Sequence, residues 1–518
     1  MNETSIYTLL YHGTQHSELS GEFSLPDYLP DVRRVLRVTA APHITGKYMN
    51  GERLELEGEI AMTLLYCSEE STVCAFSAAL PFSQSIAIPG LDETVIITAR
   101  LSTDHAACRL TGPRKCVLRT KPSLYVRAAA QKDLTPERSS LPQAEAANLC
   151  CDTKELSASD LVCLSRADLR YAEDISSGES VIVTVLSCEV TPVIRECRAM
   201  AGGVVCKGEF VITALCSVQE ESGMVCRTLH RRAAFSETLD DPAVTDACRC
   251  EPDLTVTAVT PTVTEEGRNL GVDFVCDLAM LCSADIRVPV ITDAFLPSYD
   301  VQLPTESHTV FRPLKTVFGA LSSSAALKYD VQEVPKAVTD ARMTAAFDRW
   351  ELRDGRIHID GTLEISAICT AENGTCFPLS GSVPLHWDTD AAGLTDRQSL
   401  LVQTECAVAG QNTRIDSTAG EVICDAELSL TVSIAAKEQQ EIPRALTLPP
   451  DAKPYPPTKE RLIFCYPEPG ESVWDIAKRY RIPPQTVCAA NGLDTASKTA
   501  DASPLIIPIH PVFAKSKA

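Results

Sequence analysis

The segment that decides the fold is Leu54-Glu-Leu-Glu-Gly58-Glu-Ile-Ala-Met-Thr-Leu-Leu-Tyr66. Apolar residues alternate in it with charged or hydroxyl residues on both sides of Gly58. A period of two over this length predicts a long amphipathic β-strand with one face in a core. Because the glycine lies on the inward face, we expect a β-bulge or close packing against another backbone at this point.

The same pattern occurs twice more, at Val204–Cys216 and Ile357–Cys369. The residues two positions after the aligned glycines are Ile60, Phe210 and Leu363, all apolar and all expected in a core. The glycines lie 150 and 153 residues apart, which is far longer than a solenoid repeat. Each repeat contains several predicted strands with polar turns, and such units usually close as sandwiches or open barrels. We therefore expect a mainly β fold with three tandem β-sandwich or open-barrel-like domains.

Composition places the boundaries between these domains. We expect domains at 1–130, 161–305 and 306–440, a linker at 131–160, a proline-rich linker at 441–459 and a last module at 460–512. Dense prolines in the 441–459 stretch favour extended polyproline geometry. The expected result is a semi-rigid spacer that holds the last module away from the body.

The last module is predicted to have the order βααβ. Ser472 and Asp475 have capping-box spacing at the start of a helix. The apolar stripe of this helix is formed by Val473, Ile476, Ala477 and Tyr480. Pro483-Pro484 starts a second helix and Asn491-Gly492 ends it. The segments 462–465 and 505–509 supply the two strands.

Charge and hydropathy exclude several classes of partner. The chain has 47 basic and 69 acidic residues, a net charge of −22, which would repel nucleic acid and anionic bilayers. We see no apolar run near the ~18–20 residues of a membrane helix, so membrane insertion is not expected. The N-terminus, Met-Asn-Glu-Thr-Ser-Ile-Tyr-Thr, has no basic and apolar signal-peptide regions. We therefore expect a cytoplasmic protein.

The sequence offers no pattern for catalysis or cofactor binding. The 22 cysteines are spread thinly and contain no Cys-x2-Cys pair, so we expect reduced structural thiols rather than disulfides or zinc ligands. We find no phosphate-binding loop, zinc-protease helix or nucleophile elbow. We expect no cofactor, no metal and no enzymatic activity; a glycan hydrolase targeted by the last module is the enzyme alternative.

Three motifs resemble known families. Gly470-Glu-Ser-Val-Trp-Asp-Ile-Ala-Lys-Arg-Tyr480 with Asn491-Gly492-Leu493 resembles a LysM module. Leu25-Pro-Asp-Tyr-Leu-Pro-Asp31, followed by the Gly58 strand, resembles the SPOCS domain of clostridial sporulation proteins, and Phe295-Leu-Pro-Ser-Tyr-Asp300 is a further family-like fragment. Repeated SPOCS units followed by one LysM are similar to the layout of a clostridial spore-coat morphogenetic family.

That resemblance implies a function. It implies a non-enzymatic adaptor at the forespore surface, in the mother-cell cytoplasm, whose LysM binds the stage IV sporulation protein A ATPase and whose SPOCS-like domains bind other coat proteins. Glycan binding is doubtful because Cys465 and Ala502 depart from the wall-binding pattern and the loop 494–501 is long. A peptidoglycan-binding cell-wall protein remains the alternative function.

The predicted partner-binding residues are Trp474, Leu462 and Ile463. Trp474 lies about 100° from Val473 around the helix, at the edge of the apolar stripe. One interpretation makes its ring a cap on the small core, and the other an exposed anchor, since tryptophan is enriched among binding hot spots. At least one of the two strand residues is expected in the core.

Overall fold

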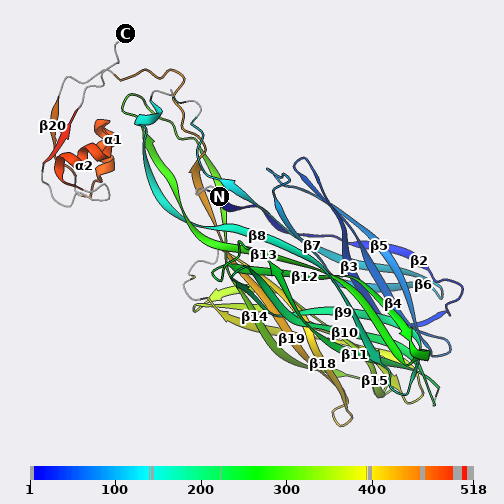
Figure 1. Cartoon of the computed structure of the whole chain (residues 1–518). Helices are drawn as coiled ribbons and strands as arrows, with labels where there is room; N and C mark the ends of the chain where they lie inside the picture. Colours follow the sequence, from blue (N-terminus) through cyan, green and yellow to red (C-terminus); the bar gives the residue numbers. More distant parts are fainter. Residues whose placement is uncertain are drawn as a thin grey trace.

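The computed structural model describes residues 5–138, 141, 145–221, 223–391, 394, 399–455, 461–468, 470–493 and 504–509. Long antiparallel strands make up most of this part of the chain, with two short α-helices near its C-terminal end (Figure 1). The expected mainly β fold is confirmed.

The three β-rich parts of the chain, one for each aligned glycine, are called units 1, 2 and 3. Unit 1 has two sheets. Its strands are β1 (Ser5–His16), β2 (Leu19–Ser24), β3 (Val32–Asn50), β4 (Arg53–Ser68), β5 (Val73–Ala87), β6 (Ile96–Gly112) and β7 (Lys115–Asp133). One sheet has the order β3-β4-β5, and in the other β7 pairs with β6 on one side and with β1 and β2 on the other. Because β1 and β2 follow one another along β7, they act as one interrupted strand.

Units 2 and 3 repeat this plan with single long first strands. The strands of unit 2 are β8 (Cys150–Ser176), β9 (Val181–Met200), β10 (Gly203–Glu220), β11 (Gly223–Asp240), β12 (Arg249–Thr264) and β13 (Asn269–Phe295). Those of unit 3 are β14 (Thr305–Lys328), β15 (Pro335–Arg353), β16 (Arg356–Ala371), β17 (Cys376–Asp390), β18 (Leu400–Asp416) and β19 (Glu421–Pro443). The sheets are β9-β10-β11 with β8-β13-β12, and β15-β16-β17 with β14-β19-β18.

The aligned glycines lie in the middle strands β4, β10 and β16, at the same point of each unit. Opposite each of them the neighbouring strand has a bulge, at residues 45, 195 and 348. A Cβ atom at Gly58, Gly208 or Gly361 would overlap a backbone carbonyl oxygen, that of His43, Val193 or Ala346 respectively. The bulge and the close backbone approach that the sequence predicted are therefore both present, for the same steric reason in all three units.

Each unit has its own apolar core between its two sheets. The three residues two positions after the glycines, Ile60, Phe210 and Leu363, are all fully buried. Phe210 lies at the centre of an aromatic cluster, with ring centroids 4.8 Å from Tyr171, 4.8 Å from Phe235 and 4.9 Å from Phe274. These cores hold the inward faces that the period-two pattern predicted.

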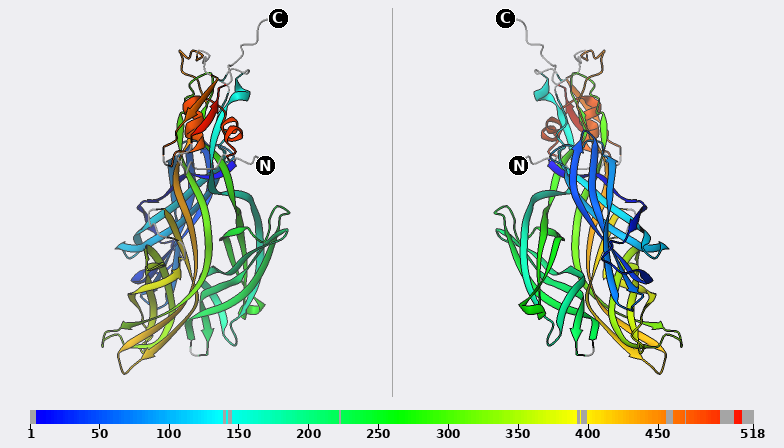
Figure 2. Two further views of the ribbon diagram at one scale, coloured as in Figure 1. Left: turned by 90° about the vertical axis from the view of Figure 1, so that its left-hand side faces the viewer. Right: turned by 90° about the vertical axis from the view of Figure 1, so that its right-hand side faces the viewer.

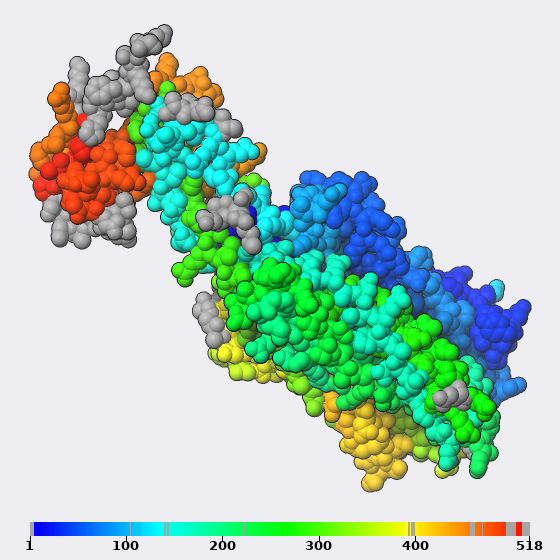
Figure 3. Space-filling view, in the orientation of Figure 1, coloured from blue at the N-terminus to red at the C-terminus, as the bar shows by residue number. Residues whose placement is uncertain are grey.

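The three units form one elongated body (Figure 2). β1 of unit 1 pairs with β14 of unit 3, which joins two of the sheets into a seven-stranded sheet. At one end, the start of β8 and the end of β13 continue as a paired stalk, with residues 150–155 opposite 289–295 (Figure 1). The small module of β20 (Leu462–Cys465), α1 (Val473–Tyr480), α2 (Pro484–Asn491) and β21 (Leu505–Pro508) sits beside this stalk (Figure 3).

Both expected linkers are wrong in part. β8 begins at Cys150, inside the predicted linker 131–160, because residues 150–160 pair with 284–295. The proline-rich stretch does not hold the module away: Glu137 pairs with Ala445, Leu446 is fully buried, and the Tyr455 N–H donates to the Ser298 carbonyl at 2.9 Å. Residues 456–460 lie outside the described residues. The two stretches become structured because they cover the apolar surface of the stalk.

The loop Leu25–Asp31 of unit 1 is held by one guanidinium. Arg114 donates to the Leu29 carbonyl at 2.9 Å, to the Pro26 carbonyl at 2.7 Å and to the Asp31 carboxylate at 2.8 Å. Tyr28, at the tip of the loop, is 83% exposed. The Pro-Asp phrase thus fixes the turn between β2 and β3 and presents a tyrosine to solvent.

All 22 cysteines lie in the described part of the chain, and all are free, buried or half-buried thiols. Burial raises the pKa of many of them, for example that of Cys206 to about 12, which keeps the thiol protonated. None of the described helices has the length and apolarity needed to cross a membrane.

Candidate functional site

The C-terminal module has the local geometry that its sequence predicts. The Ser472 hydroxyl accepts from the Asp475 N–H at 3.1 Å, and the Asp475 carboxylate accepts from the Ser472 N–H at 3.1 Å, which completes the capping box of α1. Gly492 ends α2 with a φ of 64°. The Asn491 side-chain NH2 then donates to the Ile506 carbonyl and its amide oxygen accepts from the Ile506 N–H, at 2.7 Å each, which holds β21 in place.

The sheet of this module has one buried and one exposed face. Cys465 and Ile507 point into the core, and Ile463 is half-buried against it. The alternate side chains form what we call the outer sheet face: Leu462, Phe464, Tyr466 and Ile506 are exposed by 49%, 61%, 72% and 36%. Figure 1 shows β20 on the side of the module remote from the stalk.

Trp474 lies on the opposite side of the module, against the stalk. Its ring is half-buried and meets Phe295 of β13 edge-on, with centroids 5.1 Å apart, and its Nε1–H donates to the Asp293 carboxylate at 2.9 Å. Phe295 itself belongs to the apolar cluster of the module. The half-buried indole therefore packs at the edge of the module's apolar cluster and also contacts the stalk through Phe295 and Asp293.

Ion pairs complete this joint. Lys478 donates to both oxygens of Asp293, at 2.7 and 2.6 Å, and Arg481 donates to Asp300 at 2.8 Å. The Arg481 guanidinium also stacks 3.4 Å from the ring centroid of Tyr455, whose hydroxyl bonds Asp300. Burial disfavours the charged Asp293 carboxylate, but the bonds from Lys478 and Trp474 outweigh it and lower its pKa below the ordinary value.

The three predicted partner-binding residues thus lie in three environments. Leu462 is on the outer sheet face, Ile463 packs toward the module core, and Trp474 contacts the stalk. Whether any of them touches a partner stays a prediction. The prediction of partner-binding residues from the sequence did not include Phe464 and Tyr466, two exposed aromatic residues. The alternation in Leu462-Ile-Phe-Cys-Tyr466 could have found them, since residues 462, 464 and 466 share one face of a strand.

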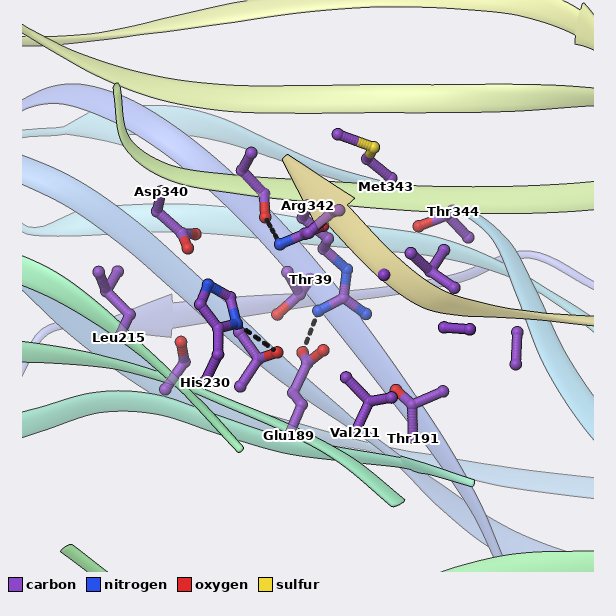
Figure 4. A pocket seen from close by; sticks show the side chains of 18 of the residues that line it. Thr39, Glu189, Thr191, Val211, Leu215, His230, Asp340, Arg342, Met343 and Thr344 are labelled. Atoms are coloured by element: carbon purple, nitrogen blue, oxygen red, sulfur yellow. Dashed lines mark hydrogen bonds and ion pairs between the residues drawn. The ribbon is translucent and has the colours of Figure 1, made fainter. Parts of the chain in front are cut away.

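A second feature is a cavity of about 370 Å³ between the three units (Figure 4). It is lined by Thr39 of β3, by residues of β9, β10 and β11, and by residues of β15 and β18. Figure 4 shows Glu189 and Arg342 joined across it as an ion pair. His230 bonds the Thr213 hydroxyl at 3.3 Å, and burial lowers its pKa, against the opposing charge of Asp340.

The charged groups around the cavity pair with one another between units. Arg37 pairs with Asp340, Arg342 with Glu189, and Arg232 with Glu427 at 3.6 Å. Within the described residues, no group of three His, Cys, Asp or Glu side chains is placed to hold a metal ion. This arrangement is that of a joint between units.

Comparison with known families identifies two parts of the chain. Residues 31–111 match the family model described as "SipL, SPOCS domain", and residues 468–497 match the LysM domain model. The first match runs from the end of the Leu25–Asp31 loop to β6 of unit 1, and the second covers α1 and α2 of the module. No curated protein and no solved structure matches the chain. The chain therefore contains a SPOCS domain and a LysM domain, as the motifs predicted.

Proposed function

We propose that this protein is a non-enzymatic adaptor in spore-coat assembly, and that the outer sheet face of its LysM module binds a protein partner. The family resemblance favours a stage IV sporulation protein A-like coat ATPase as that partner, at the forespore surface in the mother cell. The body of three units is then the scaffold that contacts other coat proteins. The matches to the SPOCS and LysM families support a role in sporulation.

The observation that carries this proposal is the outer sheet face. Four apolar side chains, two of them aromatic, are exposed on the two short strands and on the residue that follows β20: Leu462, Phe464, Tyr466 and Ile506. An exposed apolar patch on a folded module is typical of a protein interface, and aromatic residues often dominate its binding energy. Because the side of the module that carries Trp474 is fixed to the stalk, the outer sheet face is an exposed surface, among the described residues of the module, that remains available to a partner.

The test is binding of the full-length chain to the purified coat ATPase. Tyr466→Ser and Phe464→Ser should each weaken binding about tenfold or more, the effect of losing a hot-spot aromatic. Tyr28→Ser is the matched control, since Tyr28 is a similarly exposed tyrosine on unit 1. The control should bind as the parent does.

Two results would contradict the proposal. If both module variants bound the ATPase as tightly as the parent, the outer sheet face would not be the docking surface. If the parent instead sedimented with insoluble peptidoglycan and did not bind the ATPase, the cell-wall-binding function would replace the adaptor function. Circular dichroism of each variant separates a lost contact from a lost fold.

A further inference from the structure

The three units share one position that faces the middle of the body. In the first strand of each three-stranded sheet, β3, β9 and β15, a second bulge leaves one residue unpaired: Leu36, Leu186 and Thr339 respectively. The residues that follow are Arg37, Ser187 and Asp340, which pair with Leu65, Leu215 and Ile368. Each of these partners lies seven residues after the aligned glycine of its own unit. Arg37, Ser187 and Asp340 are therefore three versions of one position.

These equivalent positions meet around an axis. Leu65, Leu215 and Ile368 belong to one buried cluster although they come from three different units. Around that cluster the sheets touch in a cycle, β5 with β9, β11 with β15, and β17 with β3. The last strand of each sheet thus contacts the first strand of the next one, and the third unit closes onto the first. The body is a closed pseudo-threefold ring built from a single chain.

The side chains at the equivalent positions differ in charge, and each layer contains one cation, one anion and one hydroxyl. The first layer at the axis holds a cation, a hydroxyl and an anion, namely Arg37, Ser187 and Asp340. Two residues further along each strand the second layer holds a hydroxyl, an anion and a cation, namely Thr39, Glu189 and Arg342. Each layer is neutral as a whole, and each unit contributes a different charge to it.

The charged pair of the first layer is buried and hydrogen-bonded by all three units. The side chains of Arg37 and Asp340 are only 7% and 6% exposed, and they form an ion pair. Arg37 also donates to the Ser366 carbonyl at 2.7 Å and to its hydroxyl at 3.1 Å. The hydroxyl of Thr228, on β11 of unit 2, donates to Asp340 at 2.7 Å. All three units are therefore needed to satisfy this one pair.

In the second layer, Glu189 and Arg342 pair at the wall of the cavity, where their side chains are 41% and 33% exposed. A ring formed from three copies of one unit would bring like charges together in at least one of the two layers. Three units of type 1 would bring three guanidiniums together, and three of type 3 would bring three carboxylates together. Buried like charges without partners are strongly unfavourable.

We propose that Arg37, Asp340, Glu189 and Arg342 are specificity-determining residues that make the ring heterotypic, so that it closes only with one unit of each type. A sequential ring of related units has head-to-tail interfaces, and such interfaces join separate chains whenever the closing contact is not specified. The charge pattern excludes rings of like units from different chains. Closure within one chain then follows from the high effective concentration of its own three units.

The experiment is refolding of full-length variants from denaturant over a range of concentrations, followed by light scattering. The parent should refold to the mass of one chain. Arg37→Asp places a second carboxylate beside Asp340 and should shift most of the protein to dimers or larger species. The reversed pair Arg37→Asp with Asp340→Arg should restore the single-chain mass, because the axis again holds one cation and one anion.

A neutral axis separates specificity from stability. Arg37→Ser and Asp340→Ser give all three units the first-layer residue of unit 2, and Glu189→Thr with Arg342→Thr gives all three the second-layer residue of unit 1. This fourfold variant should yield a mixture of oligomers at the highest refolding concentrations even where circular dichroism shows native strand content. Arg356→Asp is the control, since Arg356 pairs with Asp388 within unit 3 and is half-exposed. A folded fourfold variant that refolds only to single chains at every concentration, or a reversed pair that stays oligomeric while folded, would overturn the proposal.

Discussion

The axis of the ring and the joint between the LysM module and the stalk use the same chemistry at different depths. At the axis, the Arg37 and Asp340 side chains are 7% and 6% exposed, whereas Lys478 and Asp293 at the joint are 46% and 29% exposed. Breaking a buried pair leaves an uncompensated charge and costs about 3–5 kcal/mol, while an exposed pair contributes about 0–1 kcal/mol. Burial therefore decides that the ring is a fixed scaffold and that the module is a more loosely held attachment.

The largest expected effect is on the body. Phe210→Ala should lower the free energy of unfolding by about 3–5 kcal/mol, because the aromatic residues around the Phe210 side chain cannot collapse into the cavity that its loss leaves. Phe464→Ala, in which the lost ring is 61% exposed, is the matched control and should change stability by less than about 0.5 kcal/mol. Denaturant titration measures both. An equal loss of stability in the two variants would contradict the difference in burial between Phe210 in the body and Phe464 in the module.

The next effect tests the glycine of the repeat. Gly361→Ala should cost about 1–3 kcal/mol, since the new methyl group would overlap the Ala346 carbonyl oxygen and force the bulge to shift. Gly112 has open space around its missing Cβ, so Gly112→Ala serves as the control. A Gly361→Ala protein as stable as the parent would contradict the shared steric reason for the three glycines.

A comparable effect is expected at the joint. Trp474→Glu removes the contact with Phe295 and places a carboxylate beside Asp293, so docking of the module should weaken by about 1–3 kcal/mol, the sum of an aromatic pair and one hydrogen bond. The capping box and the stripe of α1 are untouched, so the module should stay folded. Hydrogen exchange should then rise at 289–295 but not within α1. Faster exchange in α1 as well would assign Trp474 to the module core instead.

The smallest effect concerns the exposed pair itself. Lys478→Met should weaken docking by less than about 1 kcal/mol, and added salt should reduce even that difference. Because the folded pKa of Asp293 is lowered, its contribution is present above its ordinary pKa of 3.8 and is lost as the pH falls through the lower folded value. Protection at 289–295, measured as the exchange rate relative to the intrinsic amide rate at each pH, should stay constant from pH 8 to about pH 5. A marked change within that range would show that another group controls the joint.

Most of the fold could be predicted from local pattern. Alternation around Gly58, Gly208 and Gly361 placed three middle strands and their inward faces, because a strand with one buried face must repeat every two residues. The LysM helices could be placed because Ser472, Asp475 and Gly492 act on the backbone next to them. In each case the deciding interaction lies within a few residues of the signal, so the sequence by itself determined these elements.

Only the tertiary structure decided how these elements meet. Arg37 and Asp340 are 303 residues apart, and nothing near either one in the chain shows that they are partners. The contact between Trp474 and Asp293 could not be predicted because the two residues lie 181 positions apart, and the two expected linkers gained structure by packing on one stalk. Long-range pairing depends on which surfaces the chain brings together, and that depends on all three units closing the ring at once.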